Sequence, residues 1–230
     1  ATVAERAIHI DAAGRSACTR AAVCTSSNTT LGLVGNTNAG RSRCRPASHD
    51  GGYRMTSIPE PLNTLAAKID KYHESRPENM RPHFGLSQLG NTDQRGQWLG
   101  FRWAFQQQFP GRILRLFRRG HREEETVVAD LKAAGCELIH TLDDQLYIEF
   151  GSHVSGSPDG IIMSGVPEAP NKPHLLEIKT MGRKAFDAVV KEGLQKANPV
   201  YWTQVHACMQ GVTQKNTVGR PVDRCIFFAV

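Results

Sequence analysis

Three charged side chains in the last third of the chain are spaced so that two neighbouring strands could bring them together. Asp159 lies in S-P-D-G-I-I-M, and Glu177 and Lys179 lie in H-L-L-E-I-K. Because side chains alternate between the two faces of a strand, Glu177 and Lys179 share one face of an otherwise apolar strand. Residues 165–173 hold three of the twelve prolines, which is typical of a hairpin loop. Such a hairpin returns Asp159 to the side of Glu177.

These residue types suit a divalent metal ion and a phosphate. Two carboxylates that converge repel each other unless a cation lies between them, and oxygen ligands favour a hard ion, Mg²⁺ or Mn²⁺. Lys179 could orient a water molecule or neutralise charge that builds up on a phosphate. The string E-x-K is short and common, so an ordinary Glu–Lys pair on a solvated strand face is the competing interpretation.

Two polar side chains fall among apolar positions of predicted helices. Val127, Val128 and Leu131 follow Glu124 at helical spacing, so Glu124 lies on the apolar stripe of its helix. Gln204 lies in a similar seam, formed by Tyr201, Val205, Cys208 and Val212. A buried glutamine taken alone is more often a hydrogen-bonded core amide than part of a site. Together with the charged trio, both side chains become candidates for a site.

The surrounding pattern predicts the elements that position these residues. The Glu124 helix is expected over residues 123–134 with a stop at Gly135, and strands are expected over 137–141, 145–150 and 153–157. Asn198 and Pro199 begin the Gln204 helix, and Gly211 is expected to end it. The remaining expectations are a helix over 61–72, a core-facing aromatic stripe of Trp98, Phe101 and Phe105, a helix through Phe186 and Leu194, and a buried strand over 224–230.

The motifs resemble those of a known enzyme family. An aspartate followed by an E-x-K strand is the signature of the PD-(D/E)XK nucleases, and S-P-D-G with L-E-I-K resembles the phage lambda-type exonucleases, also called YqaJ-like viral recombinases. The family pattern of Gly, three residues and Glu fits Gly120 and Glu124, and its Tyr-x-x-Gln-Val pattern fits Tyr201 to Val205. The five positions occur in family order, a combination far more specific than any single motif.

The resemblance implies a restriction-endonuclease-like α/β core, with a central mixed β-sheet flanked by helices. It implies a metal-dependent exodeoxyribonuclease that degrades double-stranded DNA from its ends in phage-type recombination. The implied catalytic residues are Glu124, Asp159, Glu177, Lys179 and Gln204. The implied ligands of Mg²⁺ or Mn²⁺ are Asp159, Glu177 and the Ile178 carbonyl, with Glu124 and His121 as further candidates. The offset of His121 from the histidine of RecB-type relatives favours a DNA contact or an exposed side chain instead.

Two alternatives stay open. One is a RecB-like or structure-specific endonuclease domain of the same superfamily, and the other is a catalytically silent nuclease-fold module that binds DNA or a recombination partner. A binding module has no need of buried carboxylates that repel each other, so the trio favours an enzyme. The expected partners are double-stranded DNA ends, with a single-strand annealing recombinase and further copies of the chain as additional candidates.

The net charge of +6 is concentrated locally. Residues 1–54 hold seven arginines against three acids, which leaves the rest of the chain nearly neutral. A basic cluster precedes Glu124, and its members Arg118, Arg119 and Arg122 are predicted DNA contacts because cations beside a metal site suit a phosphate backbone. A solvated helix or loop face is the competing interpretation. The family resemblance adds Ser87 and Arg95 as DNA contacts.

The first 54 residues differ from the rest. They contain seven Leu, Ile, Val and Phe residues in total, no lysine, and no methionine before Met55. This composition predicts that residues 1–54 are a disordered or non-native N-terminal extension. Residues 55–230 are then the nuclease domain, expected to be truncated at its C-terminus because the resemblance implies a further turn, strand and helix.

The compartment is predicted from what the sequence lacks. It contains no apolar run long enough to cross a membrane and no apolar signal-peptide core, so we expect a cytoplasmic protein, in the bacterial host cytoplasm if it is phage-encoded. The six cysteines include no C-x-x-C pair and give no zinc or iron–sulfur spacing. Cys136 and Cys208 are expected to be buried thiols without disulfides.

Overall fold

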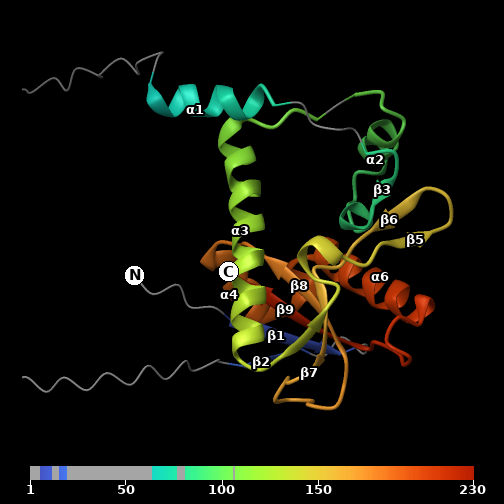
Figure 1. The fold of residues 1–230 in the computed structure, drawn as a ribbon. Coiled ribbons are helices and arrows are strands. Elements are labelled where there is room, and N and C mark those ends of the chain that lie inside the picture. Colours follow the sequence, from blue (N-terminus) through green and yellow to red (C-terminus); the bar gives the residue numbers. More distant parts are fainter. Residues whose placement is uncertain (1–5, 12–15, 20–63, 77–80, 106) are drawn as a thin grey trace, which may run out of the picture.

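A six-stranded sheet forms the base of the fold, with helices packed on both of its faces (Figure 1). The structure, a computed structural model, describes residues 6–11, 16–19, 64–76, 81–105 and 107–230. The strand order is β2, β1, β9, β8, β7, β4. The strand bounds are Arg6–Asp11 (β1), Ser16–Thr19 (β2), Glu137–Ile139 (β4), Gly160–Ser164 (β7), His174–Lys179 (β8) and Arg224–Ala229 (β9). The β8–β9 pair is parallel and its neighbours are antiparallel, so the prediction of an α/β fold with a mixed central sheet is confirmed.

Side chains of β8 alternate between two apolar clusters, as the period of two predicts. Leu175 packs into the larger cluster, against the helices α4 (Arg183–Glu192), α5 (Leu194–Ala197) and α6 (Pro199–Lys215). Leu176 and Ile178 pack into the smaller cluster, against α3 (Gly111–Ala133). Glu177 and Lys179 therefore belong to the face that α6 covers, while α3 lies on the opposite face.

The predicted hairpin joins β7 to β8. The two strands are antiparallel, with Gly160 opposite Leu176 and Ile162 opposite His174. This register places Asp159, one residue before β7, close to the end of β8 that carries Glu177. The predicted approach of these two acidic residues is therefore confirmed.

A second, smaller sheet carries an arm of the molecule (Figure 1). It consists of β3 (Phe84–Gly85), β6 (Val154–Gly156) and β5 (Ile148–Phe150), in the order β3, β6, β5. Residues 81–105, here called the α2 arm, contain β3, the 3₁₀ turn η1 (Leu86–Gln88) and α2 (Gln94–Phe101). Gly90 brings the arm against α6, because a Cβ at this position would lie 2.5 Å from the Val200 Cα.

Helix α3 is longer than the sequence predicts. It begins at Gly111 instead of residue 123, so the basic cluster lies on the same helix as Glu124. Helix α1 (Leu65–Glu74) stabilises the added half: Glu74 Oε1 accepts from the Gly111 N–H at 2.6 Å, and Asp70 pairs with Arg115 at 2.9 Å. The predicted stop is confirmed, since Gly135 follows the C-cap with φ of +90°.

The predicted start of α6 is confirmed and its predicted end is wrong. The Asn198 side chain accepts from the Tyr201 N–H at 3.1 Å, as an N-cap does. The helix continues past Gly211 to Lys215. Gly211 instead allows β5 to approach, because a Cβ here would lie 2.2 Å from Ile148 Cγ2.

The aromatic stripe of Trp98, Phe101 and Phe105 is not core, which corrects the prediction, and Phe105 lies beyond the end of α2. Trp98 is 61% exposed and Phe105 is 47% exposed. The cause is the size of the arm: η1 contacts β6 and α6, but the arm is too small to enclose both sides of α2. The burial of Cys136 is also less than predicted, since this thiol is partly exposed, whereas Cys208 and Cys225 are buried.

The N-terminal residues are also corrected in part. β1 pairs with β9 in a six-residue antiparallel ladder, and β2 pairs with β1, so residues 6–11 and 16–19 belong to the sheet. Two isoleucines at alternate positions, Ile8 and Ile10, are buried in the larger cluster, and this is enough to dock a strand on the edge of β9. Residues 20–63, with Met55, lie outside the described residues.

A histidine pair joins β1 to β8. His9 Nε2 and His174 Nε2 are 3.2 Å apart, and the His174 side chain is fully buried. The pKa of His174 is lowered to about 4, chiefly by burial and also by the neighbouring His9 and Arg224, against a backbone hydrogen bond at Lys172 and the charge of Asp223.

This pair makes stability fall in acid. Between pH 6.5, the ordinary pKa of histidine, and pH 4, the residue at position 174 binds a proton in the unfolded chain but not in the folded chain. The stability of the fold therefore rises with pH in this range and is lost as pH falls. We expect a loss on the order of 2 kcal/mol between pH 6.5 and 4. Urea unfolding across this range should show a shallower dependence in His174→Gln than in wild type. A slope in His174→Gln equal to that of wild type would contradict the prediction.

Among the described helices, none has both the length and the apolar character needed to cross a bilayer.

Candidate functional site

Glu177 lies at the centre of the candidate site. Its side chain is fully buried, on the face of β8 that α6 covers. Its Oε1 accepts a hydrogen bond from Lys179 Nζ, two residues along the same face, and Lys179 is one-fifth exposed. The competing interpretation of a solvated Glu–Lys pair is therefore wrong.

Asp159 is tied to the backbone of the strand that carries Glu177. Its Oδ2 accepts from the Ile178 N–H at 2.6 Å. Extending the β7–β8 register places Pro158 opposite Ile178, and proline has no N–H to donate to the Ile178 carbonyl. The N–H and C=O of one strand residue point to the same side of the strand. The Ile178 N–H points toward Asp159, so the Ile178 carbonyl also faces Asp159.

Helix α6 contributes Gln204 and Tyr201. Gln204 is buried, and its Nε2 donates to Glu177 Oε1 at 2.5 Å. One turn earlier, the Tyr201 ring lies 5.6 Å from Lys179 Nζ, a cation–π contact. Glu177 Oε2 and Gln204 Oε1 are both buried without a hydrogen-bond partner.

Glu124 approaches the same acidic residues from α3. Helix α3 passes the end of β8 at Gly120, where a Cβ would lie 3.7 Å from Thr180 Oγ1. One helical turn later, the side chain of Glu124 is 16% exposed, and its Oε1 accepts from Gln145 Nε2 at 3.0 Å. The pKa of Glu124 is raised by burial and by the charge of Asp159, so the two carboxylates interact.

Three carboxylates at this site share one close cation. Burial raises the pKa of Glu177 to about 7; Lys179 opposes the shift, and Asp159 and Glu124 add to it. Burial also raises the pKa of Asp159, against the charge of Lys179. Burial lowers the pKa of Lys179, but the negative charges of Glu177 and Asp159 outweigh the effect of burial and raise this pKa. The site therefore has surplus negative charge, which a bound cation would neutralise.

The donor set fits a hard divalent ion in part. Asp159, Glu177 and the Ile178 carbonyl are oxygen donors from two adjacent strand ends, and the unpartnered Oε2 of Glu177 is free to bind an ion. Within the part of the chain that the structure describes, no group of three or more His, Cys, Asp and Glu side chains is arranged to hold a metal. The ligands that fit are therefore two carboxylates and a backbone carbonyl, with Glu124 nearby.

His121 does not join this donor set. Its side chain is 80% exposed, and its Nδ1 lies 3.9 Å from Glu124 Oε2. A metal-ligand role for His121 has no support in this geometry, which favours the exposed side chain that its offset indicates.

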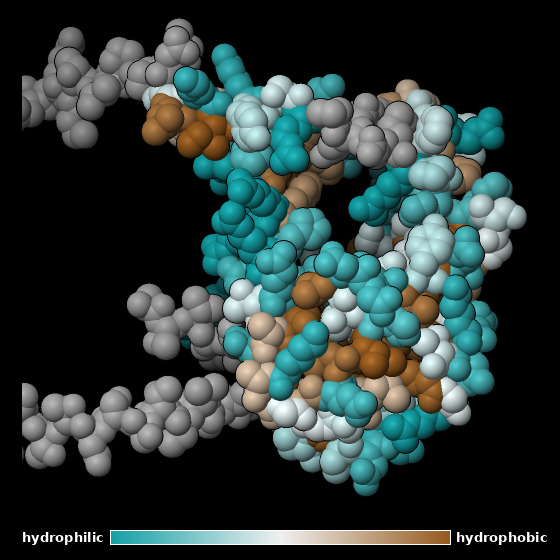
Figure 2. Space-filling model, in the orientation of Figure 1, coloured by the Kyte–Doolittle hydropathy of each residue, from teal (hydrophilic) through white to brown (hydrophobic). Residues whose placement is uncertain are grey.

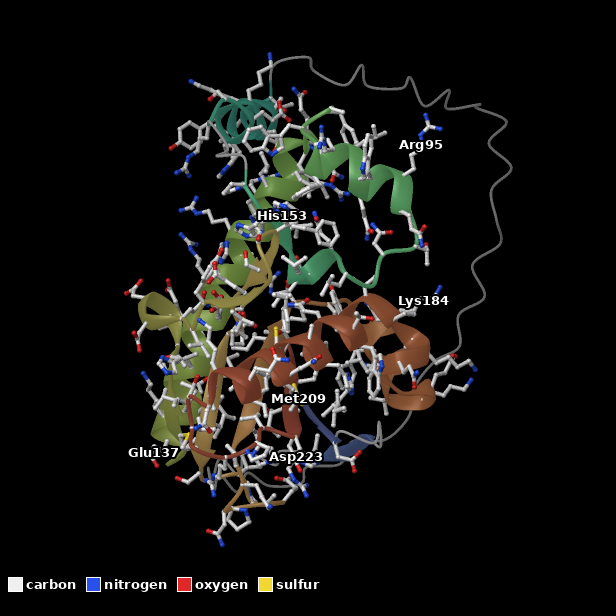
Figure 3. All side chains as sticks on the ribbon, turned by 90° about the vertical axis from the view of Figure 1, so that its right-hand side faces the viewer. Arg95, Glu137, His153, Lys184, Met209 and Asp223 are labelled. Atoms are coloured by element: carbon white, nitrogen blue, oxygen red, sulfur yellow. The ribbon has the colours of Figure 1, made fainter. Side chains whose placement is uncertain are left out.

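The predicted DNA contacts lie on two exposed surfaces. Arg118, Arg119 and Arg122 are exposed on α3, where Arg119 also pairs with Glu123 at 3.2 Å. Figure 2 shows hydrophilic side chains over this half of α3 and an open hollow between α3 and the α2 arm. Ser87 and Arg95 are exposed on the arm, and Figure 3 shows Arg95 at its outer part, away from Met209 in the body.

Two contacts of the site were missed by sequence reasoning. Gln145 follows the 3₁₀ turn η2 (Leu142–Asp144), and nothing in its spacing relates it to Glu124. Tyr201 was placed in the α6 seam, but its contact with Lys179 depends on how α6 crosses β8.

Comparisons of the chain with protein-family models, curated proteins and solved structures found no match.

Proposed function

We propose that this chain is a metal-dependent exodeoxyribonuclease with a restriction-endonuclease-like core, degrading double-stranded DNA from its ends. The observation that carries the proposal is the environment of Glu177. This carboxylate is fully buried beside Asp159 and Lys179, and one of its oxygens has no hydrogen-bond partner. A core built only for stability has no use for such a carboxylate, whereas a metal-dependent hydrolase needs one.

The proposed Mg²⁺ or Mn²⁺ would act as a Lewis acid on the scissile phosphate. Asp159, Glu177 and the Ile178 carbonyl would hold it. The Asp159 hydrogen bond to the Ile178 N–H and the Gln204 hydrogen bond to Glu177 fix the two carboxylates before the ion binds. This preorganisation lowers the cost of binding.

Lys179 and Glu124 complete the proposed machinery. Glu177 and the Tyr201 ring hold Lys179 Nζ beside the carboxylates, and the raised pKa keeps it protonated, so it can neutralise charge on a phosphate oxygen or orient the attacking water. Glu124 shares the local charge, and Gln145 fixes its side chain.

The surfaces around the site support a DNA substrate. The exposed arginines Arg118, Arg119 and Arg122 on α3 are suited to backbone phosphates, which lie in a row along a duplex. Several points stay predictions from the sequence: the preference for an end, the link to phage-type recombination, an annealing recombinase as partner, self-association and the cytoplasmic location.

The proposal is tested with linear and covalently closed duplex DNA of the same sequence, each with Mg²⁺ or with EDTA. We expect Mg²⁺-dependent release of mononucleotides from the 5′ ends of linear DNA, and intact closed circles. Equal cutting of closed circles would favour the endonuclease alternative. Calorimetric Mn²⁺ binding without hydrolysis of either substrate would contradict the proposal and favour a silent module.

A further inference from the structure

An apolar groove on the α2 arm is separate from the residues of the proposed site. It has a volume of about 300 Å³, and it is lined by Trp98 and Phe101 of α2, by Val154 of β6 and by His153, which precedes β6. Phe84 of β3 and two amide side chains, Gln94 and Gln97, complete the lining. The volume is at the lower end of the range for small-molecule sites, so the groove can take one planar group.

The groove presents an open aromatic face. Trp98 is 61% exposed although it lies among apolar neighbours. The Phe101 and His153 rings pack edge to face, with centroids 5.4 Å apart, and form a wall beside it. Exposed tryptophan in a groove is a feature of surfaces that stack planar rings.

The charge around the groove selects an anionic ligand. Residues 81–105 hold three arginines and one acid, Asp93. The Asp93 carboxylate is used to cap α2, accepting from the Gly96 N–H at 2.9 Å. Arg102 lies against the Trp98 indole, with its guanidinium carbon 5.9 Å from the ring centroid, and Arg95 is exposed on the same helix. An aromatic face with guanidinium groups around it suits a base that carries a phosphate.

The position of the arm connects this groove to the proposed site. The arm rests on α6, the helix of Gln204, through the close approach of Gly90 and Val200. In Figure 1 the arm stands across from α3, and Figure 3 shows His153 of the groove in the same upper half of the molecule as Arg95.

We propose that this groove binds an unpaired nucleobase of single-stranded DNA, stacked on Trp98. A base inside a duplex has both faces covered by its neighbours, so an open indole can receive a base that has left the stack but not one in the interior of a duplex. The inference rests on the proposed function, because the groove would hold a strand that the duplex end releases.

The test measures binding apart from hydrolysis. Fluorescence anisotropy of a labelled oligothymidylate with the full chain in EDTA gives the affinity without cleavage. Trp98→Leu, which keeps apolar area but removes the aromatic face, should weaken binding about tenfold. Trp98→Phe should retain most of the affinity. Trp103→Ala is the control, because this exposed tryptophan bonds to the Arg81 carbonyl and does not line the groove.

The outcomes separate this inference from the proposed function. The stacking site would be overturned if Trp98→Leu and Trp98→Phe lost equal affinity for oligothymidylate, or if no Trp98 variant changed the affinity. This holds even if linear duplex is hydrolysed. Oligonucleotide binding that depends on the aromatic face of Trp98, in a chain that hydrolyses no DNA, would support the groove and count against the nuclease. Failure of the wild type to bind oligothymidylate would overturn the inference.

Discussion

Asp159→Asn should lower Mg²⁺-dependent hydrolysis of linear duplex DNA by about 1,000-fold or more, with little change in the fold. Asparagine keeps an oxygen that can accept from the Ile178 N–H, so the strand end stays in place. The variant loses the negative charge that would bind the ion and that repels the other carboxylates. The free energy of unfolding should therefore stay within about 1 kcal/mol of wild type or rise.

Single-turnover hydrolysis and urea unfolding measure the two effects. Asp187→Asn is the matched control, because Asp187 is half-exposed on α4 and pairs only with Arg183 among the ion pairs described. Glu177→Gln should lose activity to the same degree but be less stable than Asp159→Asn, because Lys179 loses its closest anion. Normal Mg²⁺-dependent activity in either variant would remove that residue from the site.

Lys179→Met should lower the rate of the chemical step by orders of magnitude while Mn²⁺ still binds. The same change should destabilise the fold by about 3 kcal/mol or more near pH 7, because it leaves Glu177 buried without a counter-ion. Methionine keeps the apolar stem of the lysine, so the loss reports charge and not packing. A higher KM with unchanged kcat would make Lys179 a DNA contact only.

A double variant separates the two roles of Lys179. Without the lysine, burial raises the pKa of Glu177 unopposed, so the folded chain binds a proton that the unfolded chain releases. Stability of Lys179→Met should therefore fall as pH rises above the ordinary glutamate pKa. Adding Glu177→Gln should restore stability and flatten this dependence without restoring activity. A double variant as unstable as Lys179→Met would contradict the buried-pair explanation.

The parts of the site that came from local patterns were predicted well. Alternation in H-L-L-E-I-K placed Glu177 and Lys179 on one face, the proline-rich loop returned Asp159 to them, and the Asn198 cap set the start of α6. These features depend on a few neighbouring residues, so the sequence contains their cause.

The parts that depend on distant contacts were not predicted. The first half of α3 is stabilised by α1, through Asp70 and Glu74, and Glu124 is oriented by Gln145. Residues 1–54 have poor core composition on average, but two isoleucines at alternate positions of β1 are enough once β9 offers an edge. Average composition cannot detect so short a strand.

The pairing of β1 with β9 has a consequence for the order of folding. Ile8 lies opposite Phe227, more than two hundred positions later, so this ladder closes a very long loop. The β7–β8 hairpin closes a short one. We therefore expect the hairpin to form early, and β1 to join last and detach first during partial opening. β8 remains bonded to β7 and β9 when β1 detaches, so the acidic residues would stay assembled through such excursions.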